Sequence, residues 1–164
     1  SDVIVWMEPE KAPLVSLLFE AMKMVSAYGF DLVIPRREQL DSYPQHQQLC
    51  EFRGNWVVGN FTGRPELDLW FGPRVMSRAA ARVFIEYQGE YGDRWESIFG
   101  PVIIALSMPM ELRVGSVLVN YIHPPEQTAA ESGDEEMDKK RDLQLDLLVE
   151  AMLKACLDMG LPIK

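Results

Sequence analysis

Three arginines stand at regular spacing near the middle of the chain. Arg74, Arg78 and Arg82 follow one another at intervals of four residues. In a helix this spacing would place three guanidinium groups on one face, where each could form bidentate, charge-assisted bonds with carboxylates or phosphates of a partner. The simpler interpretation is a solvated helix face on which Arg82 pairs with Glu86. Both interpretations place a short helical insertion near residues 73–83.

Two carboxylates lie two residues apart in a predicted strand, residues 66–71. Side chains at i and i+2 of a strand point the same way, so Glu66 and Asp68 could hold a divalent metal or act as acid and base. No lysine lies close by, as nuclease-type sites usually require, and such pairs are common on the exposed face of a strand. A metal-dependent enzyme using Glu66 and Asp68 therefore remains an alternative. The favoured prediction contains no catalytic residue, metal or cofactor.

The chain has two histidines and two cysteines. His46 and His123 lie outside any zinc-binding motif and are predicted to be loop residues. His46 precedes Cys50 by four residues, a spacing that could activate a thiol. The sequence shows no third, orienting group, and Cys50 falls in a predicted strand. We therefore expect Cys50 and Cys156 to be buried, reduced thiols of a cytoplasmic protein.

Aromatic side chains offer a second kind of candidate site. Trp56 and Trp70 lie in segments rich in strand-forming residues, where aromatics usually pack in the core or across strands. An exposed tryptophan would instead favour binding of a protein partner. Trp56 and Trp70 therefore join the three arginines as candidate partner-binding residues. No P-loop, G-x-G-x-x-G or G-x-S-x-G motif accompanies them.

The charge distribution disfavours two classes of partner. The formal net charge is −9, and residues 126–150 alone carry nine acids against three basic residues. A net acidic chain binds nucleic acid and anionic membranes poorly. No apolar run reaches the roughly 18 to 20 residues that a membrane span needs. A protein partner of basic character fits this charge better than nucleic acid or membrane.

The last predicted helix, residues 134–159, has an unusually large apolar surface, against which other parts of the chain should pack. Residues 134–159 place apolar side chains at i, i+3, i+4 and i+7 over two neighbouring stripes, and only a narrow polar seam is left. Such a helix should be covered on two sides, by its own sheet and by something else. A homodimer would cover the spare face. We expect the following four side chains to form that interface: Leu145, Val149, Met152 and Leu153.

The other elements complete an α+β prediction. A second long apolar helix should occupy residues 10–28 and end at Gly29. An antiparallel sheet of about five to six strands should carry both long helices. The strand candidates are residues 3–7, 30–34, 48–52, 56–61, 66–71, 102–106 and 112–122. We expect a single domain, residues 1–164, with a mobile acidic loop at about 124–136.

These features favour a non-catalytic module for protein–protein interaction over an enzyme. The expected class is an adaptor, a chaperone or an inhibitor or immunity-like protein that acts as a homodimer. One alternative is a structural or assembly subunit of a viral or phage-like particle, in which the arginines meet the acidic loop of a neighbouring subunit. The acidic loop could also attract a basic partner and speed its encounter.

Overall fold

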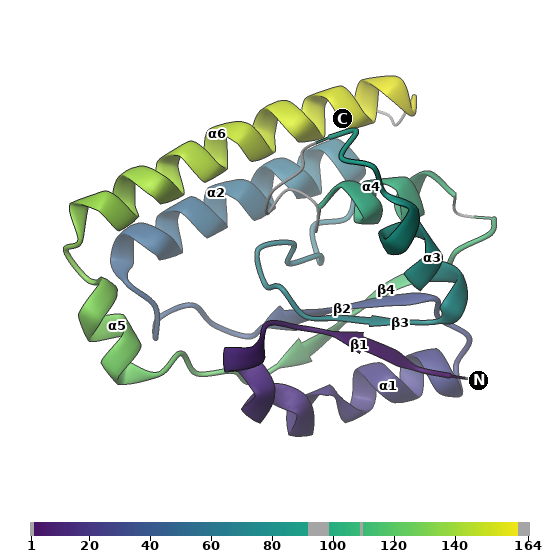
Figure 1. Cartoon of the computed structure of the whole chain (residues 1–164), viewed down its shortest axis with the longest axis horizontal. Coiled ribbons are helices and arrows are strands. Elements are labelled where there is room, and N and C mark those ends of the chain that lie inside the picture. The colour runs from purple at the N-terminus through teal and green to yellow at the C-terminus, as the bar shows by residue number, and fades with distance from the viewer. Residues whose placement is uncertain (1, 92–98, 109, 161–164) are drawn as a thin grey trace.

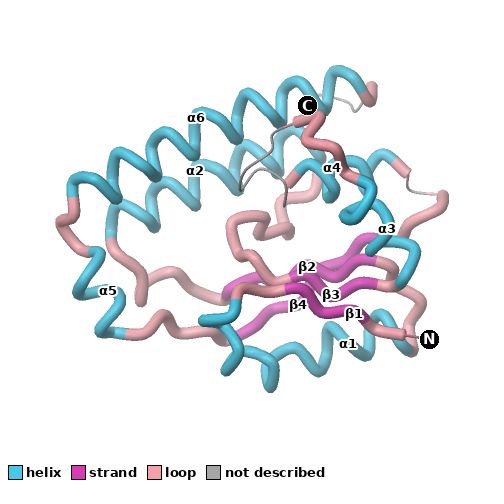
Figure 2. The backbone as a smooth tube through the Cα atoms, viewed as in Figure 1, coloured by secondary structure: helices cyan, strands magenta, loops and turns pink. Residues whose placement is uncertain are grey.

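A four-stranded mixed sheet lies between two layers of helices in the computed structural model, which describes residues 2–91, 99–108 and 110–160 (Figures 1 and 2). The strand order is β1-β3-β2-β4. Strand β3 is antiparallel to β1 and β2, whereas β2 and β4 are parallel, with Leu32 opposite Val114. The bounds are β1 Ile4–Trp6, β2 Leu32–Arg37, β3 Arg74–Met76 and β4 Val114–Val119. The α+β class is confirmed, but an antiparallel sheet of five to six strands is not.

One face of the sheet is covered by the first helical segment. It begins as a 3-10 helix, η1 (Pro9–Leu18), and continues as α1 (Phe19–Ser26). The prediction of one helix over residues 10–28 is therefore correct in position and only partly correct in type. Pro13 has no N–H to donate, which disfavours regular α-helical bonding in the first half. Gly29 follows the helix with φ +71°, the left-handed conformation expected there.

Within the described ranges, four helices lie on the opposite side of the sheet. They are α2 (Gln45–Thr62), α3 (Arg78–Glu86), α4 (Gly100–Ser107) and α6 (Glu135–Asp158). The helix predicted over residues 134–159 is confirmed as α6. The side chain of Asp134 caps it by accepting from the N–H groups of Glu136 and Met137. However, α6 packs mainly on α2 and α4 in an outer position, away from the sheet (Figure 1).

Helix α2 replaces two predicted strands. Residues 48–52 and 56–61 were expected to form a hairpin across Gly54, but they belong to one helix. A Cβ on Gly54 would lie 1.8 Å from Nε1 of Trp70, and one on Gly59 would lie 3.0 Å from Cα of Pro65. These glycines therefore provide room for close packing rather than a turn. Gly63, at φ +68°, ends the helix.

Two further strand predictions are wrong. Residues 102–106 lie in α4, and burial on nearly every side makes its sequence indistinguishable from that of a central strand. Residues 66–71 form buried irregular backbone. Side chains satisfy this backbone in place of a neighbouring strand. Arg74 donates to the carbonyl oxygens of Leu69, Phe71 and Pro73, and the N–H of Leu69 donates to Asn55.

The acidic segment contains a helix where a loop was expected. Residues 125–131 form α5 (Pro125–Glu131), which leads into α6 (Figure 1). Arg141 of α6 forms a largely buried ion pair with Glu131, 2.7 Å long. The hydroxyl of Thr128 donates to the carbonyl oxygen of Ser42 over 2.6 Å. Residues 125–131 are thus tied to the rest of the protein.

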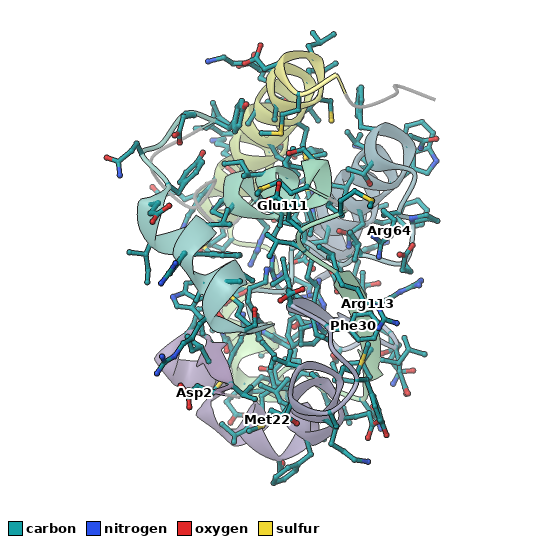
Figure 3. All side chains as sticks on the ribbon, turned by 90° about the vertical axis from the view of Figure 1, so that its right-hand side faces the viewer. Asp2, Met22, Phe30, Arg64, Glu111 and Arg113 are labelled. Atoms are coloured by element: carbon teal, nitrogen blue, oxygen red, sulfur yellow. The ribbon has the colours of Figure 1, made fainter. Side chains whose placement is uncertain are left out.

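Among the residues that the structure describes, one hydrophobic cluster packs on each side of the sheet. Leu14, Leu18 and Val25 pack against Val33 and its neighbours on the η1–α1 side. The larger cluster joins the sheet to α2, α3, α4 and α6. Just before the parallel strands β2 and β4 begin, the guanidinium of Arg113 lies over the ring of Phe30, 3.9 Å from the ring centroid (Figure 3). Among the described helices, none has both the length and the apolar character of a membrane span.

Candidate functional site

A groove of about 840 Å³ runs along one side of α2. Its walls are residues 36–40, which end and follow β2, and the outward side of α2. Leu67 and Asp68 line it from residues 66–71, which are called the irregular segment below, and Pro65 lines it just before that segment. Its volume lies within the range of roughly 300–1,000 Å³ typical of ligand sites. The groove brings together parts of the chain that are separated by up to 32 residues in sequence.

Three large apolar side chains of α2 line this groove and face solvent. Leu49, Phe52 and Trp56 are 49%, 65% and 64% exposed. Their spacing of three and four residues places them on one side of the helix, over two successive turns. The core faces a different side, occupied by Glu51, Gly54 and Val58. These three apolar residues are called the α2 apolar face below.

A buried group of charges supports the floor of the groove. The guanidinium of Arg37 donates to both carboxylate oxygens of Asp68, from Nε over 2.8 Å and from Nη2 over 3.0 Å. Its Nη1 lies 2.6 Å from Glu51 of α2. Asn55, also on α2, donates to Asp68 over 2.8 Å. These contacts tie the end of β2 and the irregular segment to α2.

The environment shifts the pKa values of this group in opposite directions. Burial by itself would raise the pKa of the Asp68 carboxyl, but the charge and hydrogen bonds of Arg37 outweigh burial and hold it below 3.8. Glu51 shows the reverse, because burial outweighs Arg37 and Gln47 and raises the pKa of Glu51 above 4.5. The guanidinium of Arg37 is therefore paired with Asp68 through two nitrogens and with Glu51 through the third.

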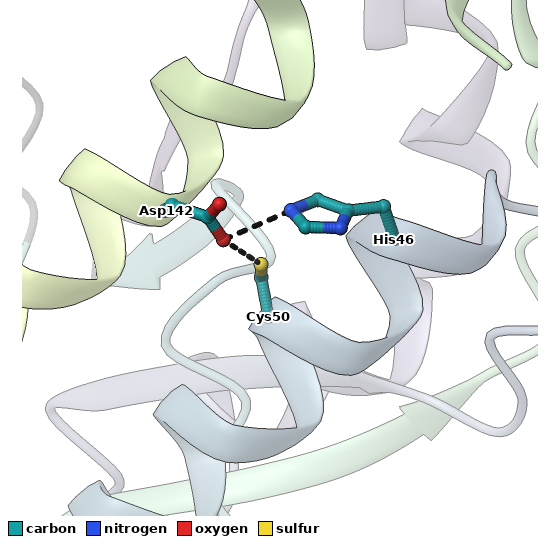
Figure 4. Close-up of side chains that lie close together, drawn as sticks. All are labelled: His46, Cys50 and Asp142. Carbon is teal, nitrogen blue, oxygen red and sulfur yellow. Dashed lines mark hydrogen bonds and ion pairs between the residues drawn. The ribbon is translucent and has the colours of Figure 1, made fainter. Parts of the chain in front are cut away.

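The neighbouring side of α2 carries a histidine and a thiol. His46 and Cys50 lie one turn apart and point toward Asp142 of α6 (Figure 4). Nε2 of His46 lies 2.9 Å from Oδ1 of Asp142, and Sγ of Cys50 lies 3.5 Å from the same oxygen. The imidazole, the thiol sulfur and the carboxylate oxygen all lie within 4.8 Å of one another. This group is called the His-Cys-Asp cluster below.

The sequence shows no third group beside His46 and Cys50, but in the structure Asp142, 92 residues after Cys50, contacts both. Cys50 lies on a helix, not in a strand. The order of the groups is wrong for an activated nucleophile, because the carboxylate lies between the thiol and the imidazole, so the thiol bonds to Asp142 instead of to a base. Burial and Asp142 raise the pKa of Cys50 to about 11, which keeps the thiol protonated at neutral pH.

The three predicted arginines do not form one stripe. Arg74 is buried in β3 and bonds to backbone carbonyl oxygens, whereas Arg78 and Arg82 are exposed on α3. Burial lowers the pKa of Arg74 to about 10, so it stays charged at neutral pH. Arg78 pairs with Asp2 at 2.5 Å. Helix α3 and the acidic segment lie at opposite ends of the molecule, so they do not meet within one chain (Figure 1).

The paired carboxylates are also separated. Glu66 pairs with Arg64, and Asp68 pairs with Arg37. Because the oxygens of Asp68 already accept from Arg37 and Asn55, they are not free to bind a metal together with Glu66. This geometry gives no support to a metal-dependent enzyme at Glu66 and Asp68.

The remaining predicted residues divide between surface and core. Trp56 lines the groove, whereas Trp70 is half-buried and packs edge-on against Phe99, with the ring centroids 5.8 Å apart. On α6, Met152 belongs to the core and is not available for an interface. Leu145 and Val149 are half-buried, and Leu153 is exposed. Both cysteines are free and buried, as expected.

No protein-family model, curated protein or solved structure matches this chain.

Proposed function

We propose that this protein is a non-catalytic protein-binding module whose groove receives an amphipathic helix of a partner, with basic residues on the polar face of that helix. The observation that carries the proposal is the α2 apolar face: Leu49, Phe52 and Trp56, half to two-thirds exposed beside a groove. An amphipathic helix binds such a groove by laying its own apolar face against apolar side chains of the groove, and the α2 apolar face provides those side chains. Exposed aromatic residues are also frequent hot spots.

The charge of the chain supports a basic partner. A net charge of −9 attracts basic segments over long range and speeds encounter at low salt. Within the groove, Arg37 and Asp68 neutralise each other, so burial of an apolar segment there adds no unpaired charge at these two positions. We further propose that the protein acts in the reducing cytoplasm, in line with its two free thiols.

A Leu/Lys amphipathic peptide of about 18 residues, long enough to form a helix, tests the proposal. With a fluorescein label, its anisotropy should rise saturably as the protein is added. Phe52→Ser and Trp56→Ser should each weaken binding about tenfold or more, since truncating a hot spot typically costs 2 kcal/mol or more. Phe19→Ser, an equally exposed aromatic on the other helical layer, is the matched control and should bind as the original protein does.

Two results would overturn the proposal. One is equal affinity of the groove variants and the original protein for the peptide. The other is equal binding of a peptide with the same composition in scrambled order, because only the ordered peptide has an apolar face. Equal binding of a Leu/Glu peptide would overturn the basic character of the partner.

A further inference from the structure

The His-Cys-Asp cluster has the composition of a transition-metal site. Imidazole nitrogen, thiolate sulfur and carboxylate oxygen are the three ligand types that Zn²⁺ uses in proteins. Two of the ligands, His46 and Cys50, come from successive turns of α2, and Asp142 comes from α6. The three donor atoms lie between the two helices, within 4.8 Å of one another (Figure 4).

The two separations from Asp142 lie close to those expected around one metal ion, and the separation between His46 and Cys50 is within 4.8 Å. With bonds of about 2.1 Å to nitrogen and oxygen and about 2.3 Å to sulfur, tetrahedral coordination places donor atoms about 3.4 to 3.6 Å apart. The observed separation from Cys50 Sγ to Asp142 Oδ1 is 3.5 Å, and that from His46 Nε2 to the same oxygen is 2.9 Å. A small rotation of the exposed Asp142 side chain would open the second distance.

The charges of the three side chains and their exposure to solvent are also suited to a divalent metal ion. A thiolate and a carboxylate together neutralise a dication, and the imidazole binds as a neutral ligand. Cys50 is buried, whereas the side chains of His46 and Asp142 are 34% and 58% exposed, so the site opens to solvent on one side. Water can therefore reach the fourth position.

We propose that His46, Cys50 and Asp142 bind one zinc-class divalent ion, with a solvent molecule as the fourth ligand. The ion replaces the thiol proton of Cys50, and that proton leaves to solvent. The ion bridges α2 and α6 in place of the direct contacts that His46 and Cys50 make with Asp142. This inference does not rest on the groove, because the two ligands on α2 face α6 while the α2 apolar face lines the groove.

The probes are Co²⁺ and Zn²⁺ alone, added to the full chain after treatment with a chelator. Co²⁺ should produce visible absorption of four-coordinate cobalt and a near-ultraviolet thiolate charge-transfer band, both saturating at one ion per chain. Zn²⁺ should displace Co²⁺ and raise the melting temperature, because a ligand that binds only the folded state stabilises it. His46→Ala, Cys50→Ser and Asp142→Asn should each weaken binding by about tenfold or more.

Two variants serve as matched controls. Cys156→Ser removes the other buried thiol, and Asp146→Asn removes an exposed acid one turn further along α6. Neither should change the cobalt spectrum or the affinity. Circular dichroism and binding of the Leu/Lys peptide confirm that the ligand variants remain folded, so that loss of metal is distinguished from loss of the groove.

The proposal is overturned if no thiolate–cobalt band forms, or if the three ligand variants bind the ions as the original protein does. It is equally overturned if Cys156→Ser abolishes the band while Cys50→Ser retains it. An ion bound with two chains per metal would also contradict a site complete within one chain.

Discussion

Arg37 and Asp68 form a buried bidentate ion pair that connects the end of β2 to the irregular segment below α2. The two residues are 31 positions apart in the sequence, so no local sequence pattern predicts their contact. Its position makes it structural: Arg37 also contacts Glu51, and Asp68 also accepts from Asn55, so both α2 and the groove depend on it.

Asp68→Asn should destabilise the protein by about 3 to 5 kcal/mol, because it leaves the Arg37 charge buried without its main partner. Urea unfolding followed by circular dichroism measures this loss. Glu66→Gln is the matched control and should change stability by less than about 1 kcal/mol, since Glu66 forms a partly exposed pair with Arg64. A nearly neutral Asp68→Asn, with loss of Mn²⁺ binding instead, would restore the metal-enzyme alternative.

His123 should make the protein less stable below neutral pH. It is stacked against Tyr43 at 4.3 Å between ring centroids, and burial lowers the pKa of His123 below 6.5. The unfolded chain therefore takes up a proton at a pH where the folded chain does not, so this contribution is full above about pH 6.5 and is lost as the pH falls toward the folded-state pKa. The urea concentration at the midpoint of unfolding should decrease when the pH is lowered from 7.5 to 5.5. His123→Gln should make that decrease smaller. An identical decrease in both proteins would contradict the prediction.

Gly54→Ala should destabilise α2 although alanine is the better helix former by about 0.5 to 1 kcal/mol. The added Cβ would overlap the Trp70 ring, 1.8 Å from Nε1, and overpacking of this kind typically costs about 1 to 3 kcal/mol. Thermal or urea unfolding measures the change. In a double-mutant cycle, Trp70→Leu should remove most of the penalty. A stabilised Gly54→Ala protein would show that Trp70 moves aside freely.

The exposed face of α6 should mediate a homodimer. Leu153 and Leu157 are exposed, and Leu145 and Val149 are half-buried beside them. Light scattering coupled to size exclusion should give the mass of a dimer in the original protein. Leu153→Asp should give a monomer, because it places a charge in the apolar contact.

Two controls define which surface forms the dimer. Ile85→Asp, at an exposed position of α3, should remain dimeric. Dissociation by Trp56→Asp instead of Leu153→Asp would show that a second copy fills the groove. A monomer at every concentration would exclude the α6 interface.

Several elements could be predicted from the sequence because their signals are local. The period of α6 and its Asp134 cap lie within single turns, and Gly29 marks the end of α1 through its own backbone conformation. The positions of β1, β2 and β4 follow from short apolar runs. These signals require no knowledge of what each element packs against.

The tertiary structure alone decided the rest. Gly54 and Gly59 resemble turn residues until Trp70 and Pro65 are seen against them, and the apolar run in α4 has no periodicity once it is buried on nearly every side. Arg74 has the spacing of a helical stripe but is needed inside the protein, where it satisfies backbone carbonyl oxygens.

The candidate sites depend on packing for the same reason. His46 and Cys50 are visible as a local pair, but Asp142 joins them only because α6 packs along α2. The groove likewise exists only because residues 36–40 and 65–68 meet beside α2. Helical period and capping are fixed by neighbours within a turn, whereas a binding site is assembled from distant segments by the free energy of the whole core.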